Sequence, residues 1–307
     1  MKVLVTGGSG YIGAVTLKAL AAAGFEPINF DLKQGNDIRN KQQVLAILKD
    51  SQIGAVMHFA AFISMGESMI NPFKYFDNNV HGSLELLQAM VEAKVNKLIF
   101  SSSAGVYGHP VSVPIKETDP TNPTNPYGQS KLMVEQMLNW YDKIHQLKSI
   151  AIRYFNAAGA DKDLGETHQP ESHLIPNVIA AAAAKKQFKL FGDDYPTPDG
   201  SCVRDYIHVS DLAEAHLLTL KALIDGHKSD VYNAGTGKGY SNKEVISMVE
   251  KISGKKIDVK VEPRRPGDTK ELVADSSKLQ KEFNWQPKKS DLKTIVESAY
   301  AYHTSKV

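Results

Sequence analysis

The strand, glycine loop and helix at the N-terminus constrain the fold more than any other part of the chain. A β-branched, apolar run over residues 2–6 leads into Gly7, and a helical pattern covers residues 11–23. Between them, Gly7, Gly10 and Gly13 follow the spacing Gly-x-x-Gly-x-x-Gly. Glycines in such a loop let the backbone approach a pyrophosphate, which then sits at the positive end of the following helix. Because the strand before and the helix after supply the required context, the pattern predicts a dinucleotide-binding unit.

Asp31 follows the next apolar run, residues 27–30, and lies 18 residues after Gly13. An acidic residue near this position binds the adenosine ribose hydroxyls in dinucleotide-binding folds. No arginine directly follows Asp31, and a carboxylate repels a 2′-phosphate, so we expect NAD rather than NADP. The alternative is an aspartate that caps a turn at the end of the strand.

Apolar, strand-like runs alternate with helical patterns through the first half of the chain. Strands are expected over residues 55–59, 97–100 and 149–154, and helices over 82–93 and 127–144. This alternation predicts an α/β fold of the Rossmann type, a doubly wound parallel sheet with helices on both faces. Ligands of such sheets bind beyond the carboxyl ends of the strands. The residues just past those ends, which we expect to converge on one crevice, are Gly7, Asp31, Phe59, Ala60, Ala61, Ser103, Phe155 and Asn156.

The regular alternation breaks up after about residue 155, where short elements are separated by loops rich in proline, glycine and aspartate. We expect a smaller, mixed α/β C-terminal lobe that covers the crevice. A helical pattern over 210–224 and a strand-like run over 230–233 indicate that the chain returns to the first domain. The expected division is a cofactor-binding domain over 1–155, joined by about 205–235, and a substrate lobe formed mainly by 156–307.

The composition is that of an ordinary globular protein, with 42% hydrophobic and 23% charged residues among 307. A formal net charge of +2 gives no strong field to attract nucleic acid or a membrane, and we expect neither as a partner. Cys202 is the only cysteine, which excludes an intrachain disulfide and a cysteine-based metal site, and we expect no metal. The first strand begins at residue 2, which leaves no room for a signal peptide, so we expect a cytoplasmic protein.

Tyr127 and Lys131 form the strongest catalytic pattern in the chain. Residues four apart are neighbours on one face of a helix, so the ammonium of Lys131 is expected beside the phenol of Tyr127. A nearby positive charge favours the phenolate and can bring its pKa from about 10 toward neutrality. The hydroxyl of Ser103, further upstream, would share the substrate's proton. Together the three side chains predict a general base for a sugar or alcohol hydroxyl, as a hydride-transfer enzyme requires.

Eight stretches in this order resemble the extended short-chain dehydrogenase/reductase family and, within it, the UDP-glucose 4-epimerases. They are GGSGYIG (7–13), HFAA (58–61), DNNV (77–80), SSSAGVYG (101–108), PYGQSK (126–131), RYFNAAG (153–159), VRDYIHV (203–209) and PRRPGD (263–268). The resemblance covers nearly the whole chain. It implies interconversion of UDP-glucose and UDP-galactose by transient oxidation at C4 with bound NAD and non-stereospecific return of the hydride. It also implies a homodimer that packs two long helices from each subunit, with residues 82–93 and 127–144 as candidates.

The resemblance also assigns roles to individual residues. The catalytic residues would be Tyr127, Lys131 and Ser103. The cofactor would be held by Gly7, Gly10, Tyr11, Ile12, Gly13, Asp31, Leu32, Asp37, Ile38, Phe59, Ala60, Ala61, Asn78, Ser101, Tyr127, Lys131 and Phe155. The UDP-sugar would be held by Ser103, Tyr127, Asn156, His173, Leu174, Arg204, Arg265 and Asp268.

The substrate residues have simpler interpretations as well. Arginines suit a diphosphate because they make planar, charge-assisted contacts, but Arg204 and Arg265 would also serve in ion pairs with Asp205 and Asp268. Asp268 would otherwise cap a turn. We expect Trp140 and Trp285 to be core residues.

Related enzymes use the same base for other reactions on UDP-sugars. Other 4-epimerases act on N-acetylated sugars or pentoses, and Leu272, seven positions after Arg265, is larger than the small residue that admits a 2-acetamido group in dual-specificity relatives. The 4,6-dehydratases place an acidic residue directly after the active-site serine or threonine, whereas Ala104 and Gly105 follow Ser103 here. Non-catalytic regulators usually lack the tyrosine–lysine pair, which this chain keeps.

The connection from Asp31 to Asp37 departs from the family pattern because it is unusually short. It leaves little room for a further strand before Asp37. We therefore expect a more open adenosine end beside Leu32, Asp37 and Ile38.

Overall fold

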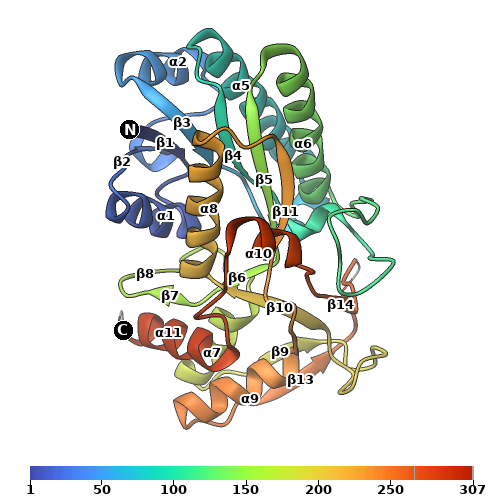
Figure 1. Ribbon diagram of the computed structural model, residues 1–307. Coiled ribbons are helices and arrows are strands. Elements are labelled where there is room, and N and C mark those ends of the chain that lie inside the picture. The colour runs from blue at the N-terminus through green and yellow to red at the C-terminus, as the bar shows by residue number, and fades with distance from the viewer. Residues whose placement is uncertain (266, 306–307) are drawn as a thin grey trace.

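The chain folds around a six-stranded parallel sheet, which occupies the upper part of Figure 1. The computed structural model describes residues 1–265 and 267–305, so Pro266 of the 263–268 stretch lies outside the described residues. The strands are β1 (Lys2–Thr6), β2 (Glu26–Phe30), β3 (Ile53–His58), β4 (Lys97–Ser101), β5 (Lys148–Tyr154) and β11 (Asp230–Ala234). Their spatial order is β11-β5-β4-β3-β1-β2, and neighbouring strands are parallel. The predicted Rossmann-type α/β fold is confirmed.

Helices cover both faces of this sheet. On one face lie α2 (Lys41–Asp50), α5 (Gly82–Glu92) and α6 (Pro126–His145), and on the other α1 (Tyr11–Ala22) and α8 (Val209–Ile224). The strands are apolar at successive positions because both of their faces are buried. In β1, for example, Leu4 packs toward the first group of helices while Val3 and Val5 pack toward the second, and none of the three is exposed.

Short helical segments fill the connections beside the sheet. They are a 3₁₀ turn over Leu32–Gln34, α3 (Met65–Ile70), α4 (Pro72–Tyr75), a π-helical turn over Phe76–His81 and a 3₁₀ turn over Ala104–Val106. The first of these occupies the short connection after Asp31, so the chain passes from β2 to α2 without another strand.

The remaining elements form a smaller mixed lobe, seen below the large sheet in Figure 1. Its helices are α7 (Leu174–Ala184), α9 (Asn242–Ser253) and α11 (Leu292–Thr304), which pack around Ile179, Val249 and Ile295. Its strands are β6 (Asn156–Ala158), β7 (Ala160–Asp161), β8 (Leu164–Gly165), β9 (Phe188–Phe191), β10 (Val203–His208), β12 (Gly239–Ser241), β13 (Val259–Glu262) and β14 (Glu271–Leu272). Strand β10 organises the lobe, because it pairs with β6, β12 and β14.

The chain returns from the smaller lobe to the large sheet twice. The first return, which the sequence pattern indicated, is made by α8 and β11, and β11 pairs with β5. The second is α10 (Ser277–Phe283) with Trp285, which the pattern did not reveal. Trp285 is fully buried against α8, and its indole nitrogen donates to the carbonyl of Asp211 at 3.0 Å. Trp140 was expected in the core as well, but that prediction is wrong, since 60% of its surface is exposed on α6.

In the described part of the chain, no helix is both long and apolar enough to cross a membrane.

Replacing Trp285 tests whether the second return supports the large domain. Trp285→Ala should lower the free energy of unfolding by about 3–5 kcal/mol, because it removes a buried aromatic side chain and leaves a cavity. Trp285→Phe retains an aromatic ring but leaves the Asp211 carbonyl without its donor, so the loss should be smaller, about 1–3 kcal/mol. Denaturant unfolding measures both values, and an alanine variant within 1 kcal/mol of the parent would contradict the placement.

Candidate active site

The loop between β1 and α1 brings backbone atoms closer than any side chain would allow. Gly7 has φ +72°, and a Cβ there would lie 2.5 Å from the backbone nitrogen of Ala60. A Cβ on Gly13 would lie 2.2 Å from the carbonyl oxygen of Gly7. Gly10 caps α1 without a side-chain hydrogen bond, and the first turn of the helix carries no acidic residue. The loop therefore offers free N–H groups at a positive helix end, which fits the diphosphate of NAD.

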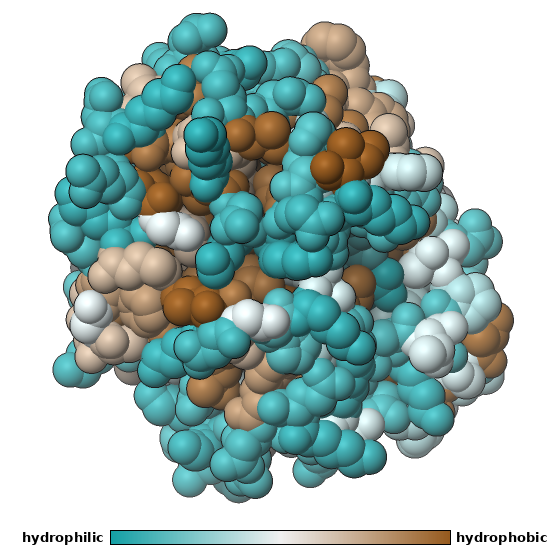
Figure 2. Space-filling view, turned by 45° about the horizontal axis from the view of Figure 1, so that its top comes forward, coloured by the Kyte–Doolittle hydropathy of each residue, from teal (hydrophilic) through white to brown (hydrophobic). Residues whose placement is uncertain are grey.

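A cleft of about 410 Å³ opens at the carboxyl ends of the parallel strands. On the face shown in Figure 2, hydrophobic residues, coloured brown, are recessed between hydrophilic rims. Of the predicted cofactor residues, the cleft is lined by Gly7, Gly10, Tyr11, Ile12, Gly13, Asp31, Leu32, Ile38, Phe59, Ala60, Ala61, Asn78, Ser101, Tyr127 and Phe155. Of the predicted substrate residues, it is lined by Ser103, Tyr127, Asn156 and His173.

Asp31 caps a turn, as its alternative interpretation held, while it also lines the cleft. Its carboxylate accepts hydrogen bonds from the backbone nitrogens of Ser9 at 3.0 Å and Lys33 at 2.9 Å. The two interpretations are therefore compatible. Lys33 also lines the cleft, and its ammonium lies 3.3 Å from the carbonyl of Ser9. The positive charge of Lys33 was not predicted, because only an arginine after Asp31 was considered.

Asp37 does not line the cleft, contrary to the expectation from the family pattern. Its carboxylate pairs with the guanidinium of Arg39 at 2.7 Å, and the same guanidinium pairs with Asp77 at 2.7 Å. The hydrogen bond from Arg39 lowers the pKa of Asp37. Ile38, next in sequence, is buried and does line the cleft, as predicted.

Tyr127 and Lys131 lie on the buried face of α6, with 6% and 3% of their surface exposed. The helix begins at Pro126 because the side chain of Asn125 caps it, accepting from the Gly128 nitrogen at 2.9 Å. Lys131 donates to the carbonyl of Ser101 at 2.8 Å, and its ammonium is 6.0 Å from the centre of the Tyr127 ring. Ser103 contacts the phenol, whereas Lys131, which was predicted to hold the cofactor, does not line the cleft.

The electrostatics of this pair differ from the expectation. Burial raises the pKa of the Tyr127 phenol, and the hydrogen bond with Ser103 only partly opposes it. Burial also lowers the pKa of Lys131 to about 7, against the opposing charge of Glu135. The expected fall of the phenol's pKa toward neutrality is therefore not produced by the chain's own groups. A phenolate at neutral pH requires a further positive charge beside the ring.

A buried ion pair stabilises the ends of β4 and β5 next to the Tyr127 helix, α6. Arg153 and Glu135 meet at 2.5 Å with 8% and 7% of their side chains exposed. Ser102, next to Ser103, donates to the same carboxylate at 2.5 Å, and Arg153 donates to the Tyr107 hydroxyl at 3.0 Å. The network ties the ends of β4 and β5 to α6. No sequence pattern identified it, because its members are distant along the chain.

Four predicted substrate residues lie outside the cleft lining, namely Leu174, Arg204, Arg265 and Asp268. Arg265 pairs with Asp268 at 3.1 Å, which is the ion pair considered as its alternative role. Arg204 instead donates to the carbonyl of Val203 at 2.9 Å. The carboxylate of Asp205 accepts from loop nitrogens such as that of Thr236 at 2.8 Å, so the alternative of an Arg204–Asp205 pair is wrong.

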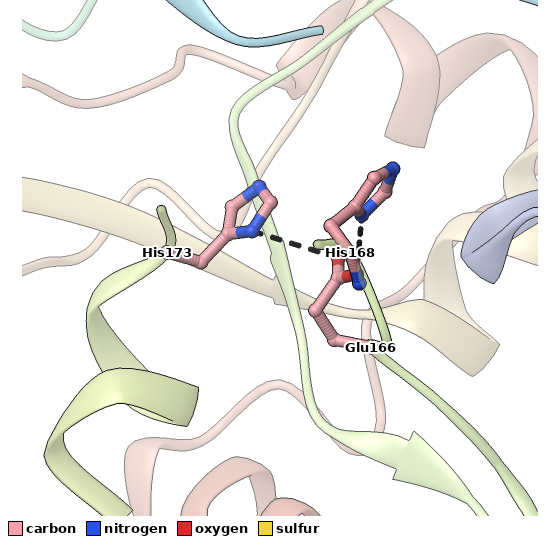
Figure 3. A group of neighbouring side chains, drawn as sticks. All are labelled: Glu166, His168 and His173. Atoms are coloured by element: carbon pink, nitrogen blue, oxygen red, sulfur yellow. Dashed lines mark hydrogen bonds and ion pairs between the residues drawn. The ribbon is translucent and has the colours of Figure 1, made fainter. Parts of the chain in front are cut away.

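Besides Lys33, the polar residues of the cleft wall that the sequence did not predict are Asn36, Tyr154, Glu166 and His168. Tyr154 accepts a hydrogen bond from Ser101 at 3.0 Å. Glu166 lies between His168 and His173, as Figure 3 shows. Burial alone would lower the pKa of His173, but the hydrogen bond to Glu171 and the charge of Glu166 raise it. The available signal was a repeated Glu-x-His pattern at 166–168 and 171–173.

Comparison with known proteins places this geometry in a family. A family model described as "NAD dependent epimerase/dehydratase family" matches residues 3–235. The chain belongs to this family. Among curated relatives, the UDP-glucose 4-epimerase of Lactobacillus helveticus is 45% identical over 99% of this chain and 98% of that protein. The UDP-glucose 4-epimerase of Halalkalibacterium halodurans is 46% identical over 99% of this chain and 96% of that protein.

Solved structures of epimerases in the NAD-dependent epimerase/dehydratase family have the same fold. The UDP-glucose 4-epimerase from Brucella ovis, solved in complex with NAD, matches with a TM-score of 0.95 at 40% identity, covering 98% of both chains. The enzyme from Bifidobacterium longum, solved in complex with NAD⁺ and UDP, matches with a TM-score of 0.92 at 38% identity, covering 99% of this chain and 98% of that one. The resemblance inferred from the eight stretches is confirmed.

Removing the buried ammonium should make the protein more stable at neutral pH. The pKa of Lys131 falls from an ordinary 10.5 to about 7, and each pKa unit corresponds to about 1.4 kcal/mol. Lys131→Met should therefore raise the free energy of unfolding at pH 7 by roughly 2–4 kcal/mol, after the lost hydrogen bond to Ser101 is subtracted. Between pH 7 and 10.5 the unfolded state binds the extra proton, so the parent gains stability and the difference should shrink.

Denaturant unfolding of the cofactor-free protein at pH 7 and pH 9.5 measures this effect. Lys143→Met is the matched control, because Lys143 is exposed on the same helix and its loss should change stability by only about 0.5 kcal/mol. A Lys131→Met variant less stable than the parent at pH 7 would show that the ammonium is not desolvated.

Proposed function

We propose that this protein interconverts UDP-glucose and UDP-galactose by inverting C4 of the sugar, with NAD as a retained cofactor. The observation that carries the proposal is that Tyr127 and Ser103 line the same cleft as the glycine loop. A base for a sugar hydroxyl and a site for a dinucleotide thus lie in one cavity. Membership of the NAD-dependent epimerase/dehydratase family supports the same reaction.

The chain's own groups divide the chemistry among them. When bound, NAD supplies the acceptor that takes a hydride from C4 and returns it, and a positive charge near the phenol. Tyr127 accepts the proton of the C4 hydroxyl and later gives it back, while Ser103 holds that hydroxyl by a hydrogen bond. Lys131, whose pKa burial lowers to about 7, holds the Ser101 carbonyl, and its protonated form places a positive charge 6.0 Å from the centre of the Tyr127 ring. The nucleotide must stay anchored while the sugar turns, which favours firm contacts to UDP and loose ones to the hexose.

Elimination of water is disfavoured by the residues after Ser103. A 4,6-dehydratase needs an acid to expel water and a base at C5. Ala104 and Gly105 occupy the positions where those enzymes carry acids, and both line the cleft without a titratable group. Reversible epimerisation needs only the tyrosine base, so it fits this wall of the cleft better.

We assign cofactor contacts to the cleft residues of the glycine loop, Asp31, Ile38, Phe59 and Asn78, and place the UDP-sugar beside Asn156 and His173. In this proposal residues 1–155, with about 205–235, form the NAD-binding domain, and 156–307 mainly form the UDP-sugar lobe. A cytoplasmic location fits the single free cysteine, Cys202, which is buried. Cell fractionation that finds the protein outside the cytoplasm would refute that location.

Tyr127→Phe should remove the base and leave the shape of the cleft unchanged. Turnover of UDP-galactose to UDP-glucose should fall by at least about 10²–10⁴-fold, the usual value of a general base. Binding of UDP-sugar and retention of NAD should persist. Tyr141→Phe is the matched control, because Tyr141 lies on the same helix and accepts a hydrogen bond from Gln88 at 2.6 Å, away from the cleft lining. Near-parental turnover in Tyr127→Phe would refute its role.

Leu272 is proposed to limit the size of the sugar. It pairs with Arg204 across β10 and β14, and it packs against the cluster that contains Ala104 and Phe155, which line the cleft. Forcing a 2-acetamido group against a packed wall costs about 1–3 kcal/mol. The parent should therefore prefer UDP-galactose over UDP-N-acetylgalactosamine in kcat/KM by about 5- to 150-fold. Leu272→Ser should shrink that ratio, and equal values for the two sugars in the parent would exclude Leu272 as the limit.

A homodimer is proposed through α5 and α6, which lie side by side. Both helices carry apolar side chains on their outer sides, with Leu84, Trp140 and Ile144 exposed by 37%, 60% and 66%. Exposed apolar patches commonly mark protein interfaces. Trp140→Glu should shift the protein from dimer to monomer in sedimentation velocity, while Val111→Glu, at an exposed position outside these helices, should not. A parent that sediments as a monomer would contradict the proposal.

A further inference from the structure

Two Glu-x-His turns stand at one wall of the cleft, between β8 and α7. In each turn the glutamate side chain accepts hydrogen bonds from the next two backbone nitrogens and contacts the Nδ1 atom of the histidine. The first turn is Glu166 to His168 and the second is Glu171 to His173. Each imidazole is therefore already oriented by its own turn, which lowers the cost of ordering it around a ligand.

The two turns converge on a single carboxylate. Nδ1 of His168 contacts Oε1 of Glu166, and Nδ1 of His173 lies 3.6 Å from its other oxygen, Oε2. Figure 3 shows both rings turned toward Glu166. The candidate ligand atoms of the three residues all lie within 4.8 Å of one another. Over residues 1–265 and 267–305, this is the only group of three or more histidine, cysteine and acidic side chains with such spacing.

We propose that Glu166, His168 and His173 form a binding site for a zinc-class divalent cation in the wall of the cleft. Two imidazole nitrogens and one carboxylate oxygen are a ligand set that zinc uses when its fourth position stays open. Zinc bonds of about 2.0–2.2 Å in a tetrahedron place the ligand atoms roughly 3.3–3.5 Å apart, close to the 3.6 Å between Nδ1 of His173 and Oε2 of Glu166. To bind the ion through this atom, His173 would give up its 2.7 Å contact with Glu171. The shorter His168–Glu166 contact needs only a small outward movement of the exposed His168 ring.

The chemistry of the ligands selects the class of cation. Magnesium and calcium prefer shells made wholly of oxygen, whereas imidazole suits zinc, cobalt, nickel and copper. Glu166 is almost fully buried, with 7% of its side chain exposed, and its partners in the wall are two backbone nitrogens and the rings of His168 and His173. Because the three residues also line the cleft, water or another oxygen ligand can reach the open position from that side. The site shares no residue with the tyrosine base on α6, but it lines the same cleft, and His173 is also the residue beside which the UDP-sugar is placed.

Equilibrium binding of zinc to the full chain, loaded with NAD and freed of metal by a chelator, tests the proposal. A chromophoric chelator that competes for Zn²⁺ should report one ion per chain. His168→Gln and His173→Gln should each weaken binding by at least about 10–100-fold, since loss of even an outer partner costs that much. His81→Gln is the matched control, because His81 lies between two carboxylates, those of Asp77 and Glu85, at 3.3 and 3.6 Å, and should bind like the parent.

Cobalt and thermal unfolding give readouts that do not depend on activity. Co²⁺ bound to the parent should show the intense visible bands of four-coordinate cobalt, and Glu166→Gln should lose them. Zn²⁺ should raise the melting temperature of the parent but not that of the His168→Gln/His173→Gln double variant, because an ion that binds the native state stabilises it. Weak binding of several ions that the variants leave unchanged would mean adventitious metal only, and would overturn the proposal.

Discussion

The close approach of the backbone at Gly7 to the chain leaving β3 is the constraint on which the cleft depends. With 2.5 Å between an imagined Cβ and the nitrogen of Ala60, no side chain fits there. This approach lets the ends of β1 and β3 lie side by side. At Gly13, the start of α1 packs directly on the backbone of Gly7 and Gly8 in the same loop. The first turn of α1 then faces the cavity with unpaired N–H groups. A larger residue at either glycine would push the helix away and weaken the positive end that attracts a diphosphate.

The burial of Tyr127 and Lys131 on α6 is the second feature that determines the chemistry of the cleft. Tyr127 and Lys131 are both removed from water, and this favours the neutral form of each. A phenolate at neutral pH would therefore need a further positive charge beside the ring. Burying two ionisable groups in this way costs stability. Glu135 contributes twice, because it raises the pKa of Lys131 and anchors the buried guanidinium of Arg153.

Local sequence patterns predicted those features that depend on residues close together in the sequence. The strands, the helices on both faces and the positions of Gly7, Asp31 and Ser103 at strand ends follow from alternation and from the geometry of parallel sheets. Contacts between distant segments did not follow in this way. Trp285 packs against α8, although the two are far apart in the sequence. Trp140 lies on the outer side of α6, whose opposite face packs in the core. The cluster around Glu166 was not predicted, because the sequence does not show that the two Glu-x-His segments lie close together in the folded chain.

The pairs Arg153–Glu135 and Arg265–Asp268 show how burial decides which arginine side chains are free to make new contacts. Arg153 is buried with Glu135, and removing one member of such a pair leaves an uncompensated charge at a cost of about 3–5 kcal/mol. Arg265 is 54% exposed beside Asp268, and a surface pair of this kind is worth only about 0–1 kcal/mol. A diphosphate can therefore draw Arg265 away from Asp268 at little cost, while Arg153 stays in place. Arg265 also lies over the Phe191 ring, 4.8 Å from its centre, so two surface contacts hold it where a buried network holds Arg153.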